Sequence, residues 1–143
     1  MFMDTITLPA KIENLPTVLN FIHNQLNGLD ILENILFELE LAIEEVYVNI
    51  ARYAYGEEEG EVTITSCIGG NPLQIIIEFR DSGIPFDPLK NEDPDFSIKT
   101  EEKEIGGLGI HLIKKNVDYI GYEFHNGENV LTLKKSLTLS GNR

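Results

Sequence analysis

The sequence predicts an α+β fold: a two-layer sandwich in which helices cover one face of a mostly antiparallel, mixed sheet. Three observations support this class. Segments with helical spacing of apolar residues alternate with β-type runs, in the order strand, helix, helix, two strands, long connection, helix, two strands. Two pairs of strands are joined by turn sequences, GGNP and HNGE. The 143 residues, 1–143, contain no repeat or low-complexity block and have the length of a single domain.

The N-terminal third predicts one short strand and two helices. The alternation TITL at residues 5–8 indicates the strand. In the next segment four apolar residues recur at helical spacing before Gly28 ends the pattern: Val18, Phe21, Ile22 and Leu26. Asp30 and Glu33 then form a capping-box pattern, so Asp30 is expected to be the N-cap of the second helix. This long helix has its own apolar stripe: Leu32, Leu36, Leu39, Ile43, Val46 and Ile50.

A hairpin, a long connection and a third helix follow. The runs VTITSCI and LQIIIEF, separated by GGNP, indicate the hairpin. The connection over residues 83–106 exceeds the roughly 12 to 15 residues that compact domains leave without regular structure, which is typical of a lid, a binding loop or disorder. The run GGLGIHLIKKNVDYI predicts a helix that opens with glycines and has this apolar face: Leu108, Leu112, Ile113 and Val117.

The C-terminal segment predicts a second hairpin. Its strands, around YEF and NVLTLKK, flank Asn126 and Gly127, which are the preferred pair for a tight turn. Lys134 and Lys135 are expected at a solvated strand end, before a frayed terminus.

The composition narrows the classes of function. A formal charge of -13 argues against a surface that binds nucleic acid or anionic lipid, because such surfaces need clustered lysine and arginine. Cys67 is the single cysteine and is expected to be a buried thiol in a strand. A single cysteine cannot form an internal disulfide, and its presence fits a reducing compartment. The chain has no apolar run of roughly 20 residues and no signal-peptide pattern. We therefore expect a cytoplasmic protein without nucleic-acid or membrane partners.

Three polar features together predict a nucleotide site. Glu45 and Asn49 are four residues apart and therefore share one face of a helix, RDSG ends a buried strand, and GGLG opens a helix. Each feature alone is typical of a solvated helix face, a turn or a helix start. Together they suit a nucleotide, because Asp81 can accept a hydrogen bond from the amino group of adenine and Gly83 lets the backbone approach the flat base.

The other two features suit phosphates and a metal ion. Gly107 and Gly109 at a helix start expose N–H groups toward phosphate oxygens. The oxygen of Asn49 suits Mg²⁺ held between phosphates, and Glu45 can accept a proton or orient a nucleophile. A Walker-type phosphate loop and the dinucleotide-binding pattern G-x-G-x-x-G are both missing from the sequence.

At these residues the sequence resembles the small serine protein kinases of the GHKL (histidine-kinase-like) ATPase superfamily that act as bacterial anti-sigma factors, the RsbW type. EEVYVNIARYAY is similar to the N box of this family, DSGIPFDP to its first glycine box and GGLGIHLIKK to its second. The resemblance implies a Bergerat ATP-binding fold with a lid at about residues 87–105. It also implies these roles: Glu45 as catalytic base, Asn49 as Mg²⁺ ligand, Asp81 and Gly83 at adenine, and Gly107 and Gly109 at the phosphates.

The resemblance further implies a Mg-ATP-dependent serine/threonine kinase whose substrate is a STAS-domain anti-anti-sigma protein, whose second partner is a sigma factor, and which forms a homodimer. The chain departs from the family pattern before the second glycine box, where Glu104 and Ile105 replace a frequent arginine. It also has Tyr53 where a histidine is frequent and Glu128 where a threonine is frequent.

Two alternative functions follow. The missing arginine motivates an ATP-binding regulatory module that binds a partner without kinase activity. The catalytic domain of a sensor histidine kinase is disfavoured, because this length of chain leaves no helical hairpin for a phosphoacceptor histidine.

Overall fold

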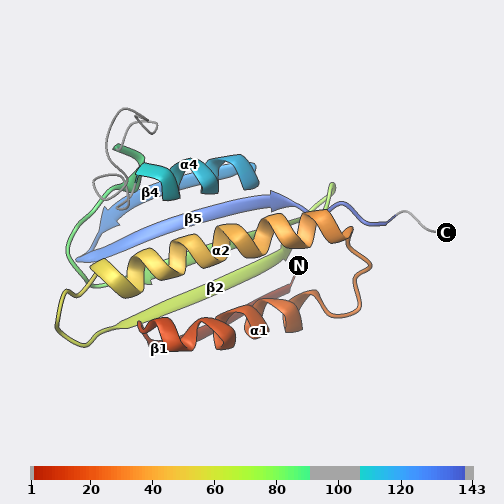
Figure 1. The fold of residues 1–143 in the computed structure, drawn as a ribbon. Coiled ribbons are helices and arrows are strands. Elements are labelled where there is room, and N and C mark those ends of the chain that lie inside the picture. Colours follow the sequence, from red (N-terminus) through yellow and green to blue (C-terminus); the bar gives the residue numbers. More distant parts are fainter. Residues whose placement is uncertain (1, 91–106, 141–143) are drawn as a thin grey trace.

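The computed structural model describes residues 2–90 and 107–140, which form a five-stranded sheet with helices on one face (Figure 1). The strands are β1 (Phe2–Pro9), β2 (Glu61–Gly69), β3 (Gln74–Asp81), β4 (Tyr119–His125) and β5 (Glu128–Ser136). The helices are α1 (Leu15–Leu26), α2 (Glu33–Tyr53) and α4 (Gly107–Asn116), with short 3-10 turns η1 (Ile12–Asn14) and η2 (Pro88–Lys90). The predicted α+β sandwich is confirmed. Most of the predicted lid, about 87–105, lies outside the described residues.

The strand order in the sheet is β1-β2-β3-β5-β4, and every pairing among the described strands is antiparallel. The sheet is therefore not mixed in this part of the chain. The reason is that β4 takes the sheet edge and β5 turns back between β4 and β3. β1 is longer than the predicted 5–8, because its pairing with β2 continues from Phe2 opposite Ile68 to Pro9 opposite Glu61.

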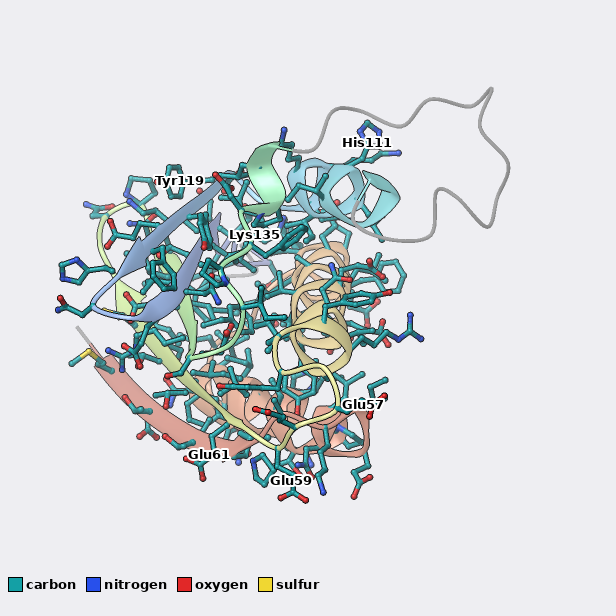
Figure 2. The ribbon with its side chains drawn as sticks, turned by 90° about the vertical axis from the view of Figure 1, so that its left-hand side faces the viewer. Glu57, Glu59, Glu61, His111, Tyr119 and Lys135 are labelled. Atoms are coloured by element: carbon teal, nitrogen blue, oxygen red, sulfur yellow. The ribbon has the colours of Figure 1, made fainter. Side chains whose placement is uncertain are left out.

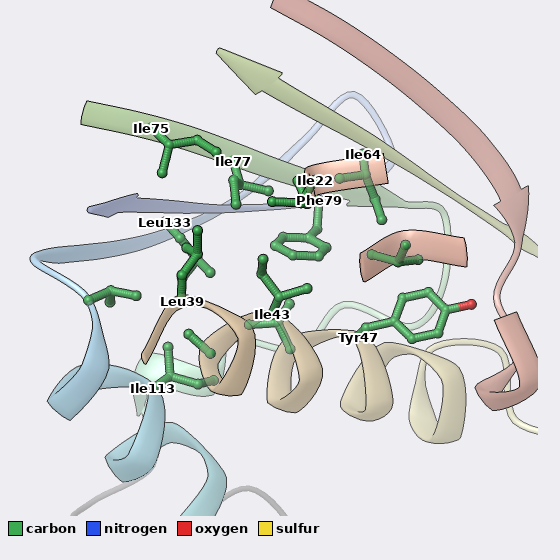
Figure 3. Close-up of a cluster of buried hydrophobic side chains, with 14 of the residues drawn as sticks. Ile22, Leu39, Ile43, Tyr47, Ile64, Ile75, Ile77, Phe79, Ile113 and Leu133 are labelled. Atoms are coloured by element: carbon green, nitrogen blue, oxygen red, sulfur yellow. The ribbon is translucent and has the colours of Figure 1, made fainter. Parts of the chain in front are cut away.

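The core lies between the sheet and the helices (Figure 3). The predicted stripe of α2 supplies Leu39, Ile43 and Val46, all buried. The strands contribute every second residue to this core, because successive side chains of a strand point to opposite faces of the sheet. Tyr47 of α2 is also fully buried, and its hydroxyl donates to the carbonyl oxygen of Lys11 over 2.6 Å, so no polar atom of this ring is left unsatisfied.

The predicted capping box at Asp30 is wrong. α2 begins at Glu33, and its N-cap residue Leu32 makes no side-chain capping hydrogen bond. Asp30 instead bonds to Ser140 near the end of the chain: its carboxylate accepts from the Ser140 hydroxyl, and its carbonyl oxygen accepts from the Ser140 N–H at 2.7 Å. A tertiary contact has thus taken the side chain that the local pattern assigned to the helix start.

The third predicted helix is present, but its buried face is shifted. Ile110, Ile113 and Val117 are buried, whereas Leu112 is only half-buried, and the side chain of Leu108 is not described. Ile110 was therefore missed as a core residue. The predicted turn between the last two strands is confirmed: Asn126 and Gly127 have φ values of 53° and 80°, the left-handed pair that a tight hairpin needs.

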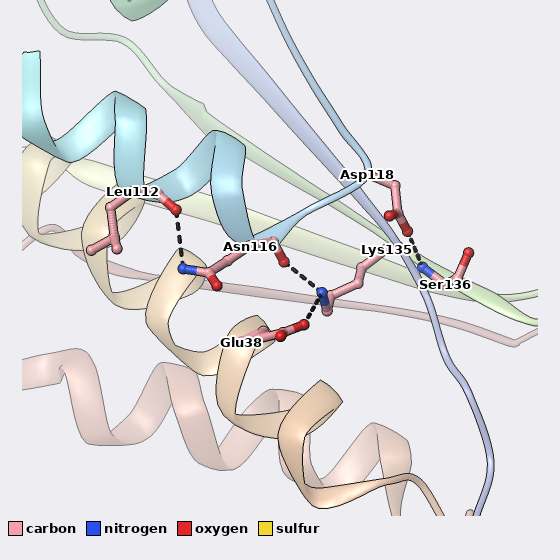
Figure 4. Close-up of polar contacts among 6 residues, drawn as sticks. All are labelled: Glu38, Leu112, Asn116, Asp118, Lys135 and Ser136. Carbon is pink, nitrogen blue, oxygen red and sulfur yellow. Dashed lines mark hydrogen bonds and ion pairs between the residues drawn. The ribbon is translucent and has the colours of Figure 1, made fainter. Parts of the chain in front are cut away.

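Lys135 overturns the expectation of a solvated strand end (Figure 4). The residue is 5% exposed, and its Nζ donates to the Asn116 carbonyl oxygen at 2.6 Å and to Glu38 Oε1 at 2.9 Å. The reason is strand parity, since Lys135 faces the helices while Lys134 faces the open side, 4.8 Å from the ring centre of Tyr119. Lys135 thus joins β5 to α2 and to the last residue of α4.

Two further features bear on the surface. Cys67 lies in a strand as expected but is half-buried rather than buried, because it points to the open face of the sheet. The acidic residues Glu57, Glu59 and Glu61 lie on the opposite side of the molecule from His111 of α4 (Figure 2). This acidic loop is therefore remote from the helix that opens with the predicted phosphate glycines.

None of the described helices is long and apolar enough to span a membrane.

Candidate functional site

The first turn of α4 packs directly on the predicted N-box residues of α2. A Cβ atom built on Gly109 would lie 2.9 Å from Glu45 Oε1 and 3.3 Å from Asn49 Nδ2. Two motifs about 60 residues apart in the sequence therefore meet, and only a glycine leaves the Glu45 carboxylate undisturbed. The amide nitrogen is the atom of Asn49 nearest to this Cβ position.

The carboxyl group of Glu45 is half-buried, and its surroundings change its pKa. Burial raises its pKa, the neighbouring Glu44 raises it further, and Arg52 lowers it. Residues 45, 49 and 52 follow the i, i+4, i+7 spacing, so Arg52 lies on the same face of α2 as Glu45 and Asn49. A raised pKa suits a group that has to accept a proton.

Asp81 ends β3 and is 6% exposed. Its Oδ1 accepts two hydrogen bonds, from the Gly83 N–H at 2.9 Å and from Asn129 Nδ2 at 2.9 Å. Burial raises the pKa of its carboxyl group, and these two hydrogen bonds oppose that rise. Since both bonds go to Oδ1, Oδ2 is left for a donor outside this network.

Gly83 lies against the C-terminal end of α2. The Ile84 N–H donates to the Ala54 carbonyl oxygen over 2.7 Å, and a Cβ on Gly83 would lie 2.1 Å from that oxygen. Close packing of two backbones therefore explains the glycine without any ligand. The adjacent Tyr55 hydroxyl accepts from the Ser82 N–H at 2.9 Å, which adds a second tie between the end of α2 and this turn.

A pocket of about 230 Å³ lies between α2, α4, the last two strands and the segment after β3. Most of its lining is apolar, and its polar lining includes Asn49, Asp81, Tyr122 and Asn129. Asn49 and Asp81 thus share one pocket. Glu45 and Gly109 adjoin it through their contact at Asn49. Gly107 is the first residue of α4, where N–H groups have no hydrogen-bond partner within the helix.

Comparison with known proteins agrees with this arrangement. The sequence model of a family described as "Histidine kinase-like ATPase domain" matches residues 8–135, which is most of the chain. The chain belongs to the histidine kinase-like ATPase domain family. Within that family it is similar to "Serine-protein kinase RsbW" of Bacillus thuringiensis, with 30% identity over 131 residues that cover 89% of this chain and 81% of the relative. Its counterpart in Bacillus anthracis is 29% identical over 131 residues, with the same coverage.

A solved structure supports the fold of this histidine kinase-like ATPase domain. The crystal structure of the RsbU and RsbW domains from Mycobacterium tuberculosis has a TM-score of 0.65 and 18% identity, and it covers 96% of this chain and 33% of that one. The chain thus spans a third of that protein's length, and the likeness supports the fold alone. The relatives confirm the resemblance read from the sequence: the chain is a member of a serine-protein kinase family.

Three polar residues of this ATPase domain were missed in the sequence. Arg52 was detectable, because it continues the helical spacing of Glu45 and Asn49. Asn129 and Tyr122 were not, because only strand register places Asn129 opposite Asp81 and brings Tyr122 of the neighbouring strand beside it. No local pattern in the sequence carries that register.

Proposed function

We propose that the chain is a Mg-ATP-dependent serine/threonine protein kinase that acts as a bacterial anti-sigma factor and phosphorylates a STAS-type anti-anti-sigma protein. The observation that carries this proposal is the contact of Gly109 with Glu45 and Asn49, beside the pocket that contains Asp81. This contact joins a proton acceptor, an amide and a helix start at one end of a mostly apolar pocket of about 230 Å³.

The residues suit a nucleotide and its metal ion. Asp81 would accept from the amino group of adenine through Oδ2, and the apolar lining would cover the base. The N–H groups of Gly107 and Gly109 would bind phosphate oxygens. Asn49 would be a Mg²⁺ ligand, and the ion would supply charge neutralisation at the phosphates. Phosphate oxygens and water would complete the oxygen ligands that Mg²⁺ prefers.

Glu45 would act on the hydroxyl group of the protein substrate. As the serine or threonine oxygen forms a bond to the terminal phosphorus, the bond from that phosphorus to the bridging oxygen breaks, ADP leaves, and the hydroxyl proton passes to Glu45. Arg52 on the same helix face would offset negative charge at this end. It would partly replace the arginine that the chain lacks before its second glycine box.

The partners belong to the same proposal. The relatives are named "Serine-protein kinase RsbW". The family resemblance read from the sequence implies a STAS-domain protein as substrate, a sigma factor as second partner, a homodimer and a cytoplasmic location.

The test is incubation of the protein with Mg-ATP and its cognate STAS protein, followed by mass spectrometry of that partner. One phosphoryl group on a serine or threonine is expected. Glu45→Gln is the test variant and Glu44→Gln its matched control, since the two glutamates are adjacent and Glu44 is exposed. If the wild-type protein binds ATP but does not phosphorylate its partner, the result would instead favour the regulatory module.

A further inference from the structure

Asn129 occupies the centre of a buried hydrogen-bond network beside Asp81. It is 7% exposed and lies directly opposite Asp81 in the β3–β5 register. Its Nδ2 donates to Asp81 Oδ1 at 2.9 Å and to the Ile84 carbonyl oxygen at 3.0 Å. Its Oδ1 accepts from the Phe86 N–H at 3.2 Å and from the Tyr122 hydroxyl. The amide thus uses both donors and both acceptor positions.

The surroundings fix which way this amide points. A backbone N–H can only donate and a backbone carbonyl can only accept. Phe86 therefore requires the oxygen of Asn129 on its side, and Ile84 requires the nitrogen on the other. The Tyr122 hydroxyl adds a further donor to the oxygen. As a result, Asn129 always presents N–H to Asp81.

That orientation determines the state of Asp81. Its Oδ1 accepts from both Asn129 and the Gly83 N–H, so the carboxylate is held in one rotamer, with Oδ2 as its remaining acceptor. Asp81, Asn129 and Tyr122 all line the pocket. An acceptor fixed in this way selects a ligand that has a hydrogen-bond donor at one position and rejects a ligand without it, because a buried carboxylate oxygen would be left unpaired.

We propose that Asn129, oriented by the main chain of Ile84 and Phe86 and held in addition by Tyr122, is a positioning residue for Asp81 and thereby sets the selectivity of the pocket for purines that carry an exocyclic amino group. This inference rests on the proposed function, since it assumes that the pocket takes the base of ATP. It assigns a role to a β5 residue that lies outside all three sequence motifs.

The test compares Asn129→Asp with Asn126→Asp. Both variants make the same chemical change in the same hairpin, but Asn126 is exposed in the turn. The probes are Mg-ATP and the Mg complex of purine riboside triphosphate, which lacks the amino group, and affinities are measured by calorimetry. Wild type is expected to prefer ATP by about tenfold or more, the size of one hydrogen bond to a charged group.

In Asn129→Asp the introduced carboxyl group keeps the shape of the amide but stands against the Asp81 carboxylate. At pH 8 the two repel, Asp81 is displaced, and the preference for ATP is expected to fall to about twofold or less. At pH 6 the two carboxyl groups can share a proton, which restores part of the preference for ATP. The other groups acting on this pair, Glu128, Asp87 and the hydroxyls of Tyr55 and Tyr122, are the same in both variants. Asn126→Asp is expected to match wild type at both pH values.

A role for Asn129 in packing alone would leave the preference of Asn129→Asp at the wild-type level at pH 8, and that result would overturn the inference while leaving the proposed function intact. Wild type that binds neither nucleotide would overturn the proposed function itself. If Asn129→Asp does not fold, Tyr122→Phe takes its place with Tyr119→Phe, the exposed tyrosine of the same strand, as control. A several-fold loss of preference for ATP is expected in Tyr122→Phe only, because the Asn129 oxygen keeps one of its two donors and the amide holds Asp81 less firmly. An unchanged preference in Tyr122→Phe would refute the role of this hydrogen-bond network.

Discussion

The two ends of the pocket are built in different ways. At one end, Asp81 and Asn129 are buried and hydrogen bonded to each other and to the main chain that follows β3. At the other end, Glu45 and Asn49 are half-buried on the surface of α2, and neither side chain makes a hydrogen bond to another described residue. The fold therefore fixes the end proposed to recognise the base, whereas the end proposed for chemistry keeps side chains that can adjust to a ligand.

The largest expected effect is at the chemistry end. Glu45→Gln keeps the shape of the side chain but removes the proton acceptor, so phosphoryl transfer to the partner is expected to fall by about 10²-fold or more while ATP binds as well or slightly better. Phosphorylation rates and calorimetry with Mg-ATP separate the two effects. Glu44→Gln serves as control. Transfer at the wild-type rate in Glu45→Gln would mean that Glu45 is only a solvated carboxylate.

At the recognition end, Asp81→Asn is expected to weaken ATP binding by about tenfold to a hundredfold, with activity falling in parallel. The new amide can keep both internal hydrogen bonds with its carbonyl oxygen, because both bonds go to Oδ1. It then presents N–H groups to the pocket, where the amino group of adenine needs an acceptor. Calorimetry measures the loss, and thermal melting without nucleotide should change little. A large drop in melting temperature would point to a structural role instead.

Gly109→Ala tests the contact between the two helices. The new methyl group would lie 2.9 Å from Glu45 Oε1, and the flexible carboxylate is expected to move away. We expect transfer to fall by about tenfold with little change in ATP affinity, since a small displacement of a catalytic group is costly. Lys114→Ala, an exposed site on the same helix, is the control. Equal transfer rates in the two variants would show that the position of Glu45 is not critical.

The smallest expected effect concerns Arg52. The Glu45 carboxyl group accepts a proton only when ionised, so activity is lost as the pH falls through its pKa, and burial moves that loss to higher pH than for an ordinary glutamate. Arg52 lowers this pKa. Arg52→Gln is therefore expected to shift the acid limb of the pH–rate profile to still higher pH, and this shift should become smaller in high salt. Arg80→Gln, on the open face of the sheet, should leave the limb in place.

Features with a local cause could be predicted from the sequence. The central part of the apolar stripe of α2 (Leu39, Ile43 and Val46), the GGNP hairpin and the turn at Asn126 and Gly127 depend on residues close together in the chain, and the structure confirms them. Leu32 lies before the helix, and Leu36 and Ile50 are only half-buried. The prediction that Glu45 and Asn49 share a helix face has the same local origin.

Features with a distant cause were wrong or missed. Asp30 does not cap α2, because its side chain bonds instead to Ser140, which is 110 residues away. Lys135 is buried because of strand parity, and Asn129 meets Asp81 only through the register of β3 and β5. The sequence contains these residues but does not state their pairing, so periodicity and turn chemistry alone could not locate them.

The length of α2 has a consequence for how this protein can change by insertion and deletion. The helix carries Glu45 in its body and holds the Gly83 turn with the Ala54 carbonyl at its end. The two points are nine positions apart, about 13 Å along the axis. Removing or adding one residue between them would rotate one point by about 100° relative to the other. This stretch of α2 should therefore keep a constant number of residues among variants of the chain.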